Sequence, residues 1–336
     1  MDVAAAPPLA DTPPVGLRAI QGPVAGDLDV FRERFRDAMR SRVRLLDTVV
    51  QYLLRRKGKQ IRPTLVLLSA EMAGGVTERS YRAAALVELL HTATLVHDDV
   101  VDEADTRRGV ASVNALWRNK VGVLLGDYLL SRGLLLALDD GDYDLLHVMS
   151  DAVRRMSEGE LLQIETARRL DMTEDRYFQI IGDKTGSLIA ACMAAGAASA
   201  GAGPETVARA KAIGETIGLA FQIRDDLFDY DGGGAGKPVG LDLQDRKMTL
   251  PLILALERAP AAEAKRVRRI VARRKKSRAQ TAEVLRFVRD SGGLAAARDR
   301  METLAARAAA ELRRFPESEA RDALVGLCAY VVARAR

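Results

Sequence analysis

The chain has 336 residues, of which 48% are hydrophobic and only 4% aromatic, and its formal net charge is +5. That length suffices for one large domain or two modest ones. The abundance of Ala, Leu and Arg, which favour helices, and the scarcity of alternating strand patterns predict an all-α protein. Cys192 and Cys328 lie in apolar helical surroundings, which excludes a disulfide framework.

The first 25 residues are rich in Pro and Ala and are expected to form a disordered tail. They lack the basic and apolar regions of a signal peptide. Residues 26–336 are expected to form a single helical domain. Because the chain holds no uncharged apolar run of 18 or more residues, we expect no membrane-spanning helix and a cytoplasmic location.

Apolar residues recur at helical spacing from Asp27 to about Arg56. Gly58 interrupts this pattern, and Pro63 can occupy the first turn of the next helix. That helix, at about 64–73, is apolar nearly all round and should be buried.

The following helix, expected from Thr77, ends in three carboxylates, Asp98, Asp99 and Asp102. Residues four apart share a helix face, so Asp98 and Asp102 should project together. Such acids repel one another unless a cation lies between them, and hard oxygen ligands suit Mg²⁺. With Arg107 next in the chain, the cluster indicates a site for a polyanion. A solvated helix end paired with arginines is the alternative.

A second cluster repeats this spacing 127 residues later, in Asp225, Asp226 and Asp229, again after an apolar helical run. Two such clusters could face each other across a cavity. The helices expected between the clusters span 113–138, 143–169, 173–201 and 204–230.

A Gly-rich break at 231–246 follows, of a kind that is usually functional beside a site. The remaining helices are expected at 248–256, 261–276, 279–290 and 294–314 and from about 317. The segment 265–278 holds nine basic residues but no aromatic residues for base stacking. We therefore expect a solvated helix face and no nucleic-acid partner, while a weak association with an anionic membrane surface stays open.

Candidate phosphate-binding residues surround both clusters. They are Gly58, Lys59 and Arg62 in a GKxxRP motif, Lys184 beside Thr185, Gln222, and Lys237 and Lys247 around the Gly-rich break.

From about residue 50 to 255 the sequence resembles the trans-isoprenyl diphosphate synthase (polyprenyl synthetase) family. The motifs occur in the family's order: GKQIRP, DDVVDEADTRRG, GELLQIE, DKTGSL, FQIRDDLFDYD and GKPVGLDLQDRKMTLPL. One departure is Arg246 before Lys247, where many members have Gly. The resemblance implies a single-domain helical bundle around a deep central cavity, usually in a homodimer. It also implies head-to-tail (1′-4) condensation of isopentenyl diphosphate onto an allylic diphosphate (dimethylallyl, geranyl, farnesyl or geranylgeranyl).

The resemblance further implies three Mg²⁺ ions, which stabilise the charge on the departing diphosphate. Asp98, Asp102 and Asp225 would hold the metal, and Asp99, Asp226 and Asp229 would be ligands or orient water. The residues implied for the allylic diphosphate are Arg107, Lys184, Gln222, Lys237 and Lys247. Catalytic roles fall to Lys184, Thr185 and Gln222, of which Thr185 and Gln222 offer oxygen dipoles to the carbocation.

Isopentenyl diphosphate would be held by Gly58, Lys59, Arg62, His91 and Arg108. A core histidine without a ligand is the alternative for His91. No protein base is evident, and in the family the released diphosphate is thought to take the proton.

Chain length should depend on Ala93, five residues before Asp98, because family members with short products tend to have an aromatic residue near this point. Leu90 and Thr94 flank Ala93, and Tyr128 and Leu135 would form a deeper floor. The small lining resembles that of long-chain synthases and predicts products longer than C20, about C30 to C50, such as quinone side chains. Geranylgeranyl diphosphate synthase is the alternative enzyme. A non-catalytic partner subunit is disfavoured because both clusters are complete, and a terpene cyclase or head-to-head synthase because neither needs GKxxRP.

Overall fold

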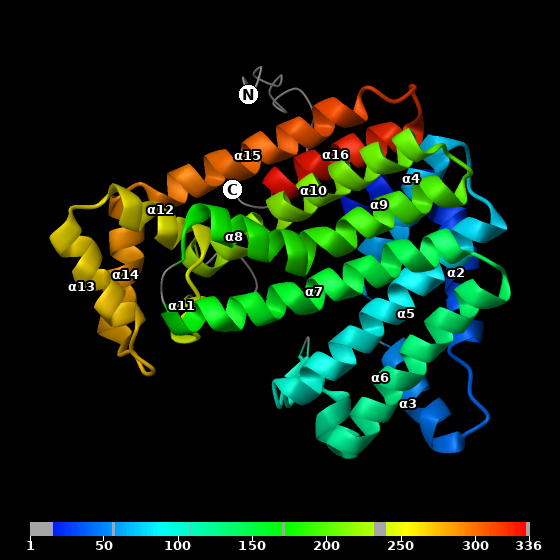
Figure 1. The fold of residues 1–336 in the computed structure, drawn as a ribbon, viewed down its shortest axis with the longest axis horizontal. Helices are drawn as coiled ribbons and strands as arrows, with labels where there is room; N and C mark the ends of the chain where they lie inside the picture. Colours follow the sequence, from blue (N-terminus) through cyan, green and yellow to red (C-terminus); the bar gives the residue numbers. More distant parts are fainter. Residues whose placement is uncertain (1–15, 56–57, 108, 170–171, 232–239, 334–336) are drawn as a thin grey trace.

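The computed structural model describes residues 16–55, 58–107, 109–169, 172–231 and 240–333, and all structural statements below concern these ranges. Helices dominate them (Figure 1), which confirms the all-α prediction. The helices of the first half are α1 (Leu17–Gln21), η2 (Gly22–Val24), α2 (Ala25–Ala38), α3 (Arg44–Leu54), α4 (Ile61–Ala73), α5 (Glu78–Val101), α6 (Val113–Asp139) and α7 (Tyr143–Arg169). Those of the second half are α8 (Glu174–Ile181), η3 (Gly182–Gly186), α9 (Ser187–Ser199), α10 (Pro204–Asp231), α11 (Leu241–Gln244), α12 (Leu250–Arg258), α13 (Ala261–Val271), α14 (Arg278–Asp290), α15 (Gly293–Leu312) and α16 (Glu319–Ala333).

The core is built around α9, whose Ala-rich sequence is buried at nearly every position. Helices α4, α5, α7 and α10 all contact it. In Figure 1, α7, α9 and α10 run side by side, α15 and α16 cover α10, and α13 and α14 project at one end. Small side chains let these backbones approach closely, which explains how a helix of low amphipathicity serves as a central element.

The predicted disordered tail is wrong from residue 17 onward. Leu17–Gln21 and Gly22–Val24 are helical, and Ile20 and Val24 are fully buried in the main apolar cluster, which also includes Val332. The Pro/Ala composition hid this i, i+4 apolar pair, whose burial offsets the ordering entropy of the segment. Residues 1–15 lie outside the described residues.

The single helix expected over 27–56 is interrupted after Ala38, and α3 starts again at Arg44. Carbonyl groups at the end of α2 accept hydrogen bonds from α6 side chains: Arg132 Nε donates to Ala38 O at 2.8 Å and the Tyr128 hydroxyl to Arg40 O at 2.6 Å. These contacts take the place of the intrahelical bonds that end there.

Two two-residue strands, Thr106–Arg107 (β1) and Val110–Ala111 (β2), form an antiparallel hairpin just after the first aspartate motif. The all-α prediction did not include it. Its short strands have too few residues to show an alternating pattern.

Candidate active site

The first aspartate motif lies at the carboxyl end of α5, where Asp98 and Asp102 are both exposed. The Asp102 N–H donates to Asp98 O at 2.8 Å, so the two residues are one turn apart on one face, as predicted. Partial desolvation raises the pKa of the Asp98 carboxyl; Arg107 opposes this shift, and Asp102 and Glu160 add to it. The end of α5 therefore gathers negative charge that a cation would relieve.

Asp99 is buried beneath this pair and accepts a hydrogen bond from Arg107 Nε at 2.5 Å. The hairpin thus returns Arg107 to the end of α5. Asp99 is placed to orient its neighbours through Arg107 rather than to project with Asp98 and Asp102.

The second motif lies near the carboxyl end of α10, and its three aspartates have different environments. Asp225 has a half-exposed side chain, while Asp226 is buried and accepts hydrogen bonds from the Tyr177 hydroxyl at 2.7 Å and Gln222 Nε2 at 3.1 Å. Burial raises the pKa of Asp226 to about 7, because desolvation outweighs those two hydrogen bonds. Asp229 accepts the backbone N–H groups of Leu241 and Asp242, so it holds the start of α11.

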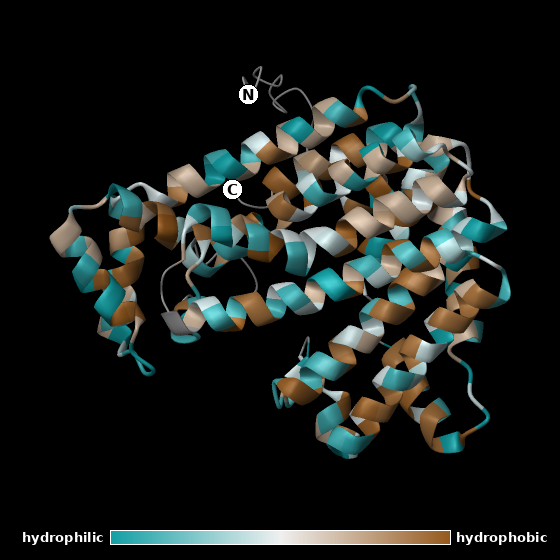
Figure 2. Cartoon of the chain, viewed as in Figure 1, coloured by the Kyte–Doolittle hydropathy of each residue, from teal (hydrophilic) through white to brown (hydrophobic). Residues whose placement is uncertain are grey.

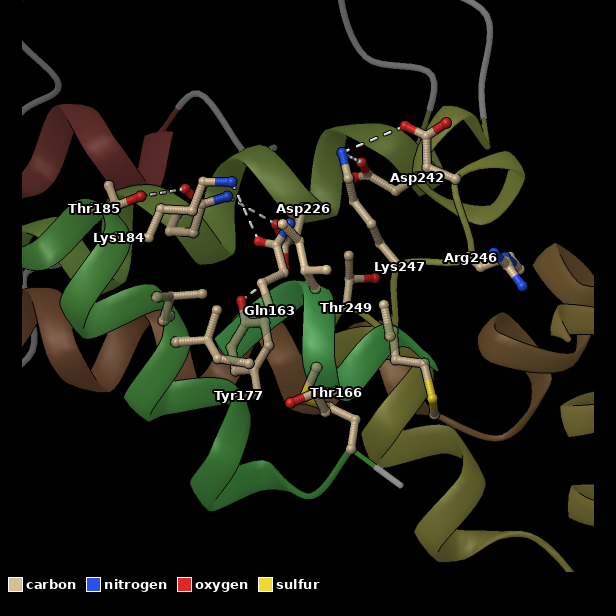
Figure 3. A pocket seen from close by; sticks show the side chains of 18 residues that line it. Gln163, Thr166, Tyr177, Lys184, Thr185, Asp226, Asp242, Arg246, Lys247 and Thr249 are labelled. Carbon is tan, nitrogen blue, oxygen red and sulfur yellow. Dashed lines mark hydrogen bonds and ion pairs between the residues drawn. The ribbon is translucent and has the colours of Figure 1, made fainter. Parts of the chain in front are cut away.

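A cavity of about 390 Å³ opens beside the second motif, between α7, α8, η3, α10 and the segment 242–249 (Figure 3). It brings together the predicted catalytic residues Lys184, Thr185 and Gln222 with Asp226 and Lys247. The Thr185 hydroxyl donates to Gln222 Oε1 at 2.9 Å, and Gln222 in turn donates to Asp226. A chain of hydrogen bonds therefore fixes the Gln222 amide at the cavity wall.

Lys184 and Thr185 lie in η3, a π-helical turn. Such turns often occur at functional sites because they redirect side chains within a helix. Helix α7 passes so closely that a Cβ at Gly159 would lie 2.9 Å from Lys184 N, and a Cβ at Gly218 of α10 would lie 2.8 Å from Gly186 Cα. These two glycines let α7 and α10 close on η3.

Each pocket lysine is held by acidic or amide oxygens. Lys184 forms an ion pair with Glu160 and donates to Gln163 Oε1 at 3.3 Å. Lys247 Nζ lies 3.1 Å from Asp242 Oδ1 and 3.5 Å from Asp245 Oδ2. The charge of Lys184 opposes the rise in the pKa of the Asp98 carboxyl, so the first motif lies in the electrostatic field of this cavity lysine.

The described residues predicted for isopentenyl diphosphate lie just before α4, on α4 and on α5, and outside the cavity lining. Lys59 is exposed just before α4, Arg62 is half-buried in its first turn, and His91 is buried on α5. Arg62 and Glu88 both act electrostatically on the buried Cys192 thiol, so α4, α5 and α9 converge there. Gly58 is exposed.

Two predicted residues, Arg108 and Lys237, lie outside the described residues. Their predicted roles stay predictions.

The predicted chain-length residues do not line the cavity in Figure 3. Ala93 is buried in a second apolar cluster with residues of α3 and α6, and Tyr128 packs against that cluster. Leu90 is buried in the main cluster, while Thr94 is half-buried and donates to His91 O at 2.8 Å. Leu135 is 45% exposed on α6, so the chain by itself does not bury it as the predicted floor of a tunnel.

Sequence reasoning assigned no role to several residues that the structure places at the site. Gln163 contacts Lys184, Tyr177 contacts Asp226, and Asp242 contacts Lys247. The GELLQIE motif contained a signal for Gln163. Asp242 lies in the motif GKPVGLDLQDRKMTLPL, which likewise contained a signal, whereas Tyr177 gave none, because its place depends on how α8 packs.

The donor chemistry suits a divalent cation of the Mg²⁺ or Ca²⁺ type. Asp98, Asp102 and Asp225 present exposed carboxylate oxygens, which are the hard ligands these ions prefer. Within the described ranges, no three His, Cys, Asp or Glu residues gather into a ready metal cage. That fits an ion held by one or two carboxylates together with substrate phosphates.

Comparison with known proteins decides what kind of site this is. The profile of the polyprenyl synthetase family matches residues 43–288. The chain belongs to the polyprenyl synthetase family. It is 36% identical to octaprenyl diphosphate synthase of Escherichia coli (strain K12), over 96% of this chain and 100% of that enzyme. It is 38% identical to all-trans-nonaprenyl-diphosphate synthase (geranyl-diphosphate specific) of Rhodobacter capsulatus, over 92% and 95% of the two chains.

The fold agrees with that of a solved polyprenyl synthase from Caulobacter crescentus, complexed with calcium and isoprenyl diphosphate. The TM-score is 0.87 at 33% identity, covering 96% of this chain and 99% of that one. Membership in the polyprenyl synthetase family confirms the predicted fold and reaction class: this chain is a prenyltransferase, a trans-polyprenyl diphosphate synthase.

Proposed function

We propose that this polyprenyl synthetase adds isopentenyl diphosphate units head to tail onto an allylic diphosphate, with Mg²⁺, to give all-trans products of about C30 to C50. The observation that carries this proposal is the cavity where Lys184, Thr185 and Gln222 meet from η3 and α10, within the field of Asp98. The long-chain products in the names of the two relatives support the length. A C20 product is the alternative.

The reaction breaks the C–O bond of the allylic diphosphate, and the leaving group takes the electron pair. Mg²⁺ ions, when bound at Asp98, Asp102 and Asp225, would neutralise the charge on that group. Lys184 and Lys247 each pair with a carboxylate in this structure and would exchange that partner for phosphate oxygens. Arg107 would bind phosphate through its other N–H groups, while its Nε keeps the buried Asp99 paired.

Thr185 and Gln222 would face the carbon that becomes cationic. Their hydrogen-bonded oxygens are held in place before the reaction, so they need little reorganisation when charge develops. Lys59, Arg62 and His91 would hold isopentenyl diphosphate on the α4 and α5 side. The released diphosphate would accept the proton that the new allylic product loses.

The deciding experiment incubates the purified chain and Mg²⁺ with isopentenyl diphosphate and, separately, each C5 to C20 allylic primer. Mass spectrometry of the products then gives their length. We expect C30 to C50 chains and no reaction in EDTA. A product that stops at C20 would establish the alternative, and inactivity with every primer would contradict the proposed function.

We also propose that the protein is a homodimer through α6. Helix α6 has the length and mean hydropathy, 1.6, of a membrane-spanning helix, yet only 33% of its most apolar window is buried. Its exposed apolar residues include Leu116, Val123, Leu124, Leu135 and Leu138, and Figure 2 shows hydrophobic residues along much of it. Single exposed apolar side chains are normal on a monomer, but these residues follow one helix and form a larger apolar surface. A second copy of this helix would cover that surface.

We further propose that the protein is cytoplasmic and transfers its product to membrane lipid. There the product would serve as a quinone side chain. The basic residues of α13 are exposed, whereas its core-facing positions are apolar. These basic residues would favour contact with an anionic bilayer.

A further inference from the structure

Arg224, the residue directly before Asp225, is an arginine buried inside the second aspartate motif. It is only 4% exposed. Its Nε and Nη2 donate to the same oxygen, Asp225 Oδ1, at 3.2 and 2.7 Å. None of the roles proposed above accounts for this buried charge.

Side chains of consecutive residues do not face each other on a helix, so this contact needs a special arrangement. Phe221 and Phe228, three residues before and four after Arg224, supply it. The guanidinium carbon lies 3.8 Å from the Phe221 ring centroid and 5.7 Å from that of Phe228. The rings hold the guanidinium against the helix and direct its fork toward Asp225.

The charge balance of Arg224 depends on this pair. In the part of the chain that the structure describes, its Nη1 is buried and has no hydrogen-bond partner. Leaving a charged donor incompletely bonded is costly, so Asp225 is the main compensating group for the guanidinium.

We propose that Arg224 is a positioning residue that fixes the Asp225 carboxylate in the orientation in which Oδ2 accepts a divalent cation. Both arginine donors end on Oδ1, and the side chain of Asp225 is 46% exposed, so a cation can approach the other oxygen. The inference rests on the proposed function, because it takes Asp225 as a metal ligand.

Two effects of Arg224 on metal binding oppose each other. The positive charge of Arg224 repels the cation and so weakens its binding. Because Asp225 is half-exposed, solvent screens this repulsion, which then lowers the metal affinity about fivefold. Loss of a group that orients a metal ligand weakens binding about tenfold to a hundredfold. Orientation therefore outweighs repulsion, and removal of Arg224 should weaken metal binding.

The test measures Mn²⁺ binding to the full chain, with the metal alone, from the electron paramagnetic resonance signal of the free ion. Arg224→Met should raise the Mn²⁺ dissociation constant about two- to twentyfold, because the relief of repulsion offsets part of the lost orientation. Arg224→Gln keeps a donor and removes the charge, so it should stay within about threefold of the wild type. Arg209→Met is the matched control, because Arg209 also lies on α10 over an aromatic ring, that of Phe315, but far from the motif. It should leave Mn²⁺ binding unchanged.

A second variant covers the case in which Arg224→Met does not fold. Phe221→Leu keeps both Arg224 and Asp225 but removes the ring beneath the guanidinium, and should weaken Mn²⁺ binding about threefold. A purely structural role would lower the melting temperature of the variants and leave Mn²⁺ affinity intact. That result, or equal or tighter Mn²⁺ binding in Arg224→Met, would overturn the proposal.

The wild type separates this inference from the proposed function. Prenyl transfer by the wild type together with unaltered Mn²⁺ binding in Arg224→Met defeats the positioning role alone. Asp225→Asn must itself weaken Mn²⁺ binding; if it does not, Asp225 is no ligand and Arg224 positions none.

Discussion

At the scale of single residues, the two aspartate motifs neutralise their buried acids in different ways. Asp99 is paired with a cation, Arg107, whereas among the described residues the hydrogen-bond donors to Asp226 are neutral and include Tyr177 and Gln222. A buried carboxylate without a cation resists ionisation, which is why the pKa of Asp226 rises to about 7. The identical spacing in the sequence therefore conceals two electrostatic environments.

Asp226 should make the metal-free protein less stable as the pH rises. The unfolded chain ionises this carboxyl near pH 4, whereas the folded protein keeps its proton up to about pH 7. Between these values the folded state binds more protons, so the free energy of unfolding falls by up to about 1.4 kcal/mol per pH unit. In EDTA, urea unfolding of Asp226→Asn should lack this contribution between pH 5 and 7. Parallel pH profiles for variant and wild type would contradict the assignment.

Thr185→Val should lower kcat with little change in KM, because the hydroxyl fixes the Gln222 amide rather than binding phosphate. Loss of one preorganised dipole costs up to about a hundredfold in rate. Thr166→Val is the control: Thr166 lines the same cavity, but its hydroxyl donates to Leu162 O of its own helix. Equal loss of kcat in both variants would count against a role for Thr185 at the reacting carbon.

At the scale of helices, periodicity predicted most elements but not their junctions. Helix α7 has the predicted bounds, 143–169, because its polar and apolar faces are distinct. The predicted helix 173–201 is divided into α8, the π turn η3 and α9. No pattern in DKTGSL marks that turn, since it follows from the close packing of α7 and α10 on either side. The same packing determined the place of Tyr177, which explains why the motifs predicted the acids, the lysines and Gln222 but not the Tyr177 hydroxyl that donates to Asp226.

Asp142 lies in the turn between α6 and α7 and links that turn to α5. Its buried carboxylate accepts from Arg79 Nε and Arg82 Nε, both at 2.8 Å, and Arg79 also donates to Ala198 O near the carboxyl end of α9. Asp142→Asn should lower the free energy of unfolding by about 2 kcal/mol, since the half-buried Arg79 and Arg82 lose their buried anion and keep the exposed Asp144 and Asp140 as partners.

The pH dependence of that loss follows from the lowered pKa of Asp142, for which hydrogen bonds and charge from Arg82 and Arg79 outweigh desolvation. This stabilisation is present above the unfolded-state pKa near 4 and is lost as the pH falls through the lower folded-state pKa. Urea unfolding should therefore separate wild type and variant at pH 7 and bring them progressively together as the pH falls below the unfolded-state pKa near 4. A difference that does not depend on pH would contradict the ion-pair explanation.

The product-length prediction belongs to α5 and its neighbours α3 and α6. Ala93 is 2% exposed in the second apolar cluster, five residues from the metal-binding end of α5. Ala93→Tyr should fill the path of the growing chain and shorten the product, measured as the mass of the dephosphorylated alcohols. Ala93→Ser, which changes polarity but hardly volume, should keep the wild-type length. An unchanged product in a folded Ala93→Tyr variant would show that the chain takes another route.

At the scale of the whole molecule, the distribution of apolar surface is uneven. The main cluster joins α1 to α16, while α6 buries one face against α5 and exposes the rest. The sequence predicted no membrane-spanning helix, because it holds no uncharged apolar run of 18 or more residues, and it gave no separate signal for a dimer interface on α6. The packing shows that α6 is part of the bundle, where it contacts α5, and that the rest of its apolar face is exposed.

Leu124, 58% exposed on α6, allows a direct test of that interface. Leu124→Glu places a charge where a second copy would bury it without a counterion, so light scattering after size exclusion should show a monomer where the wild type is a dimer. Thr303→Glu, at an exposed position on α15, adds the same charge elsewhere and should leave the dimer intact. A dimer that survives Leu124→Glu would place the subunit contact on another face. A wild-type monomer would mean that α6 has no second copy to cover it, and its apolar face would then need a different partner.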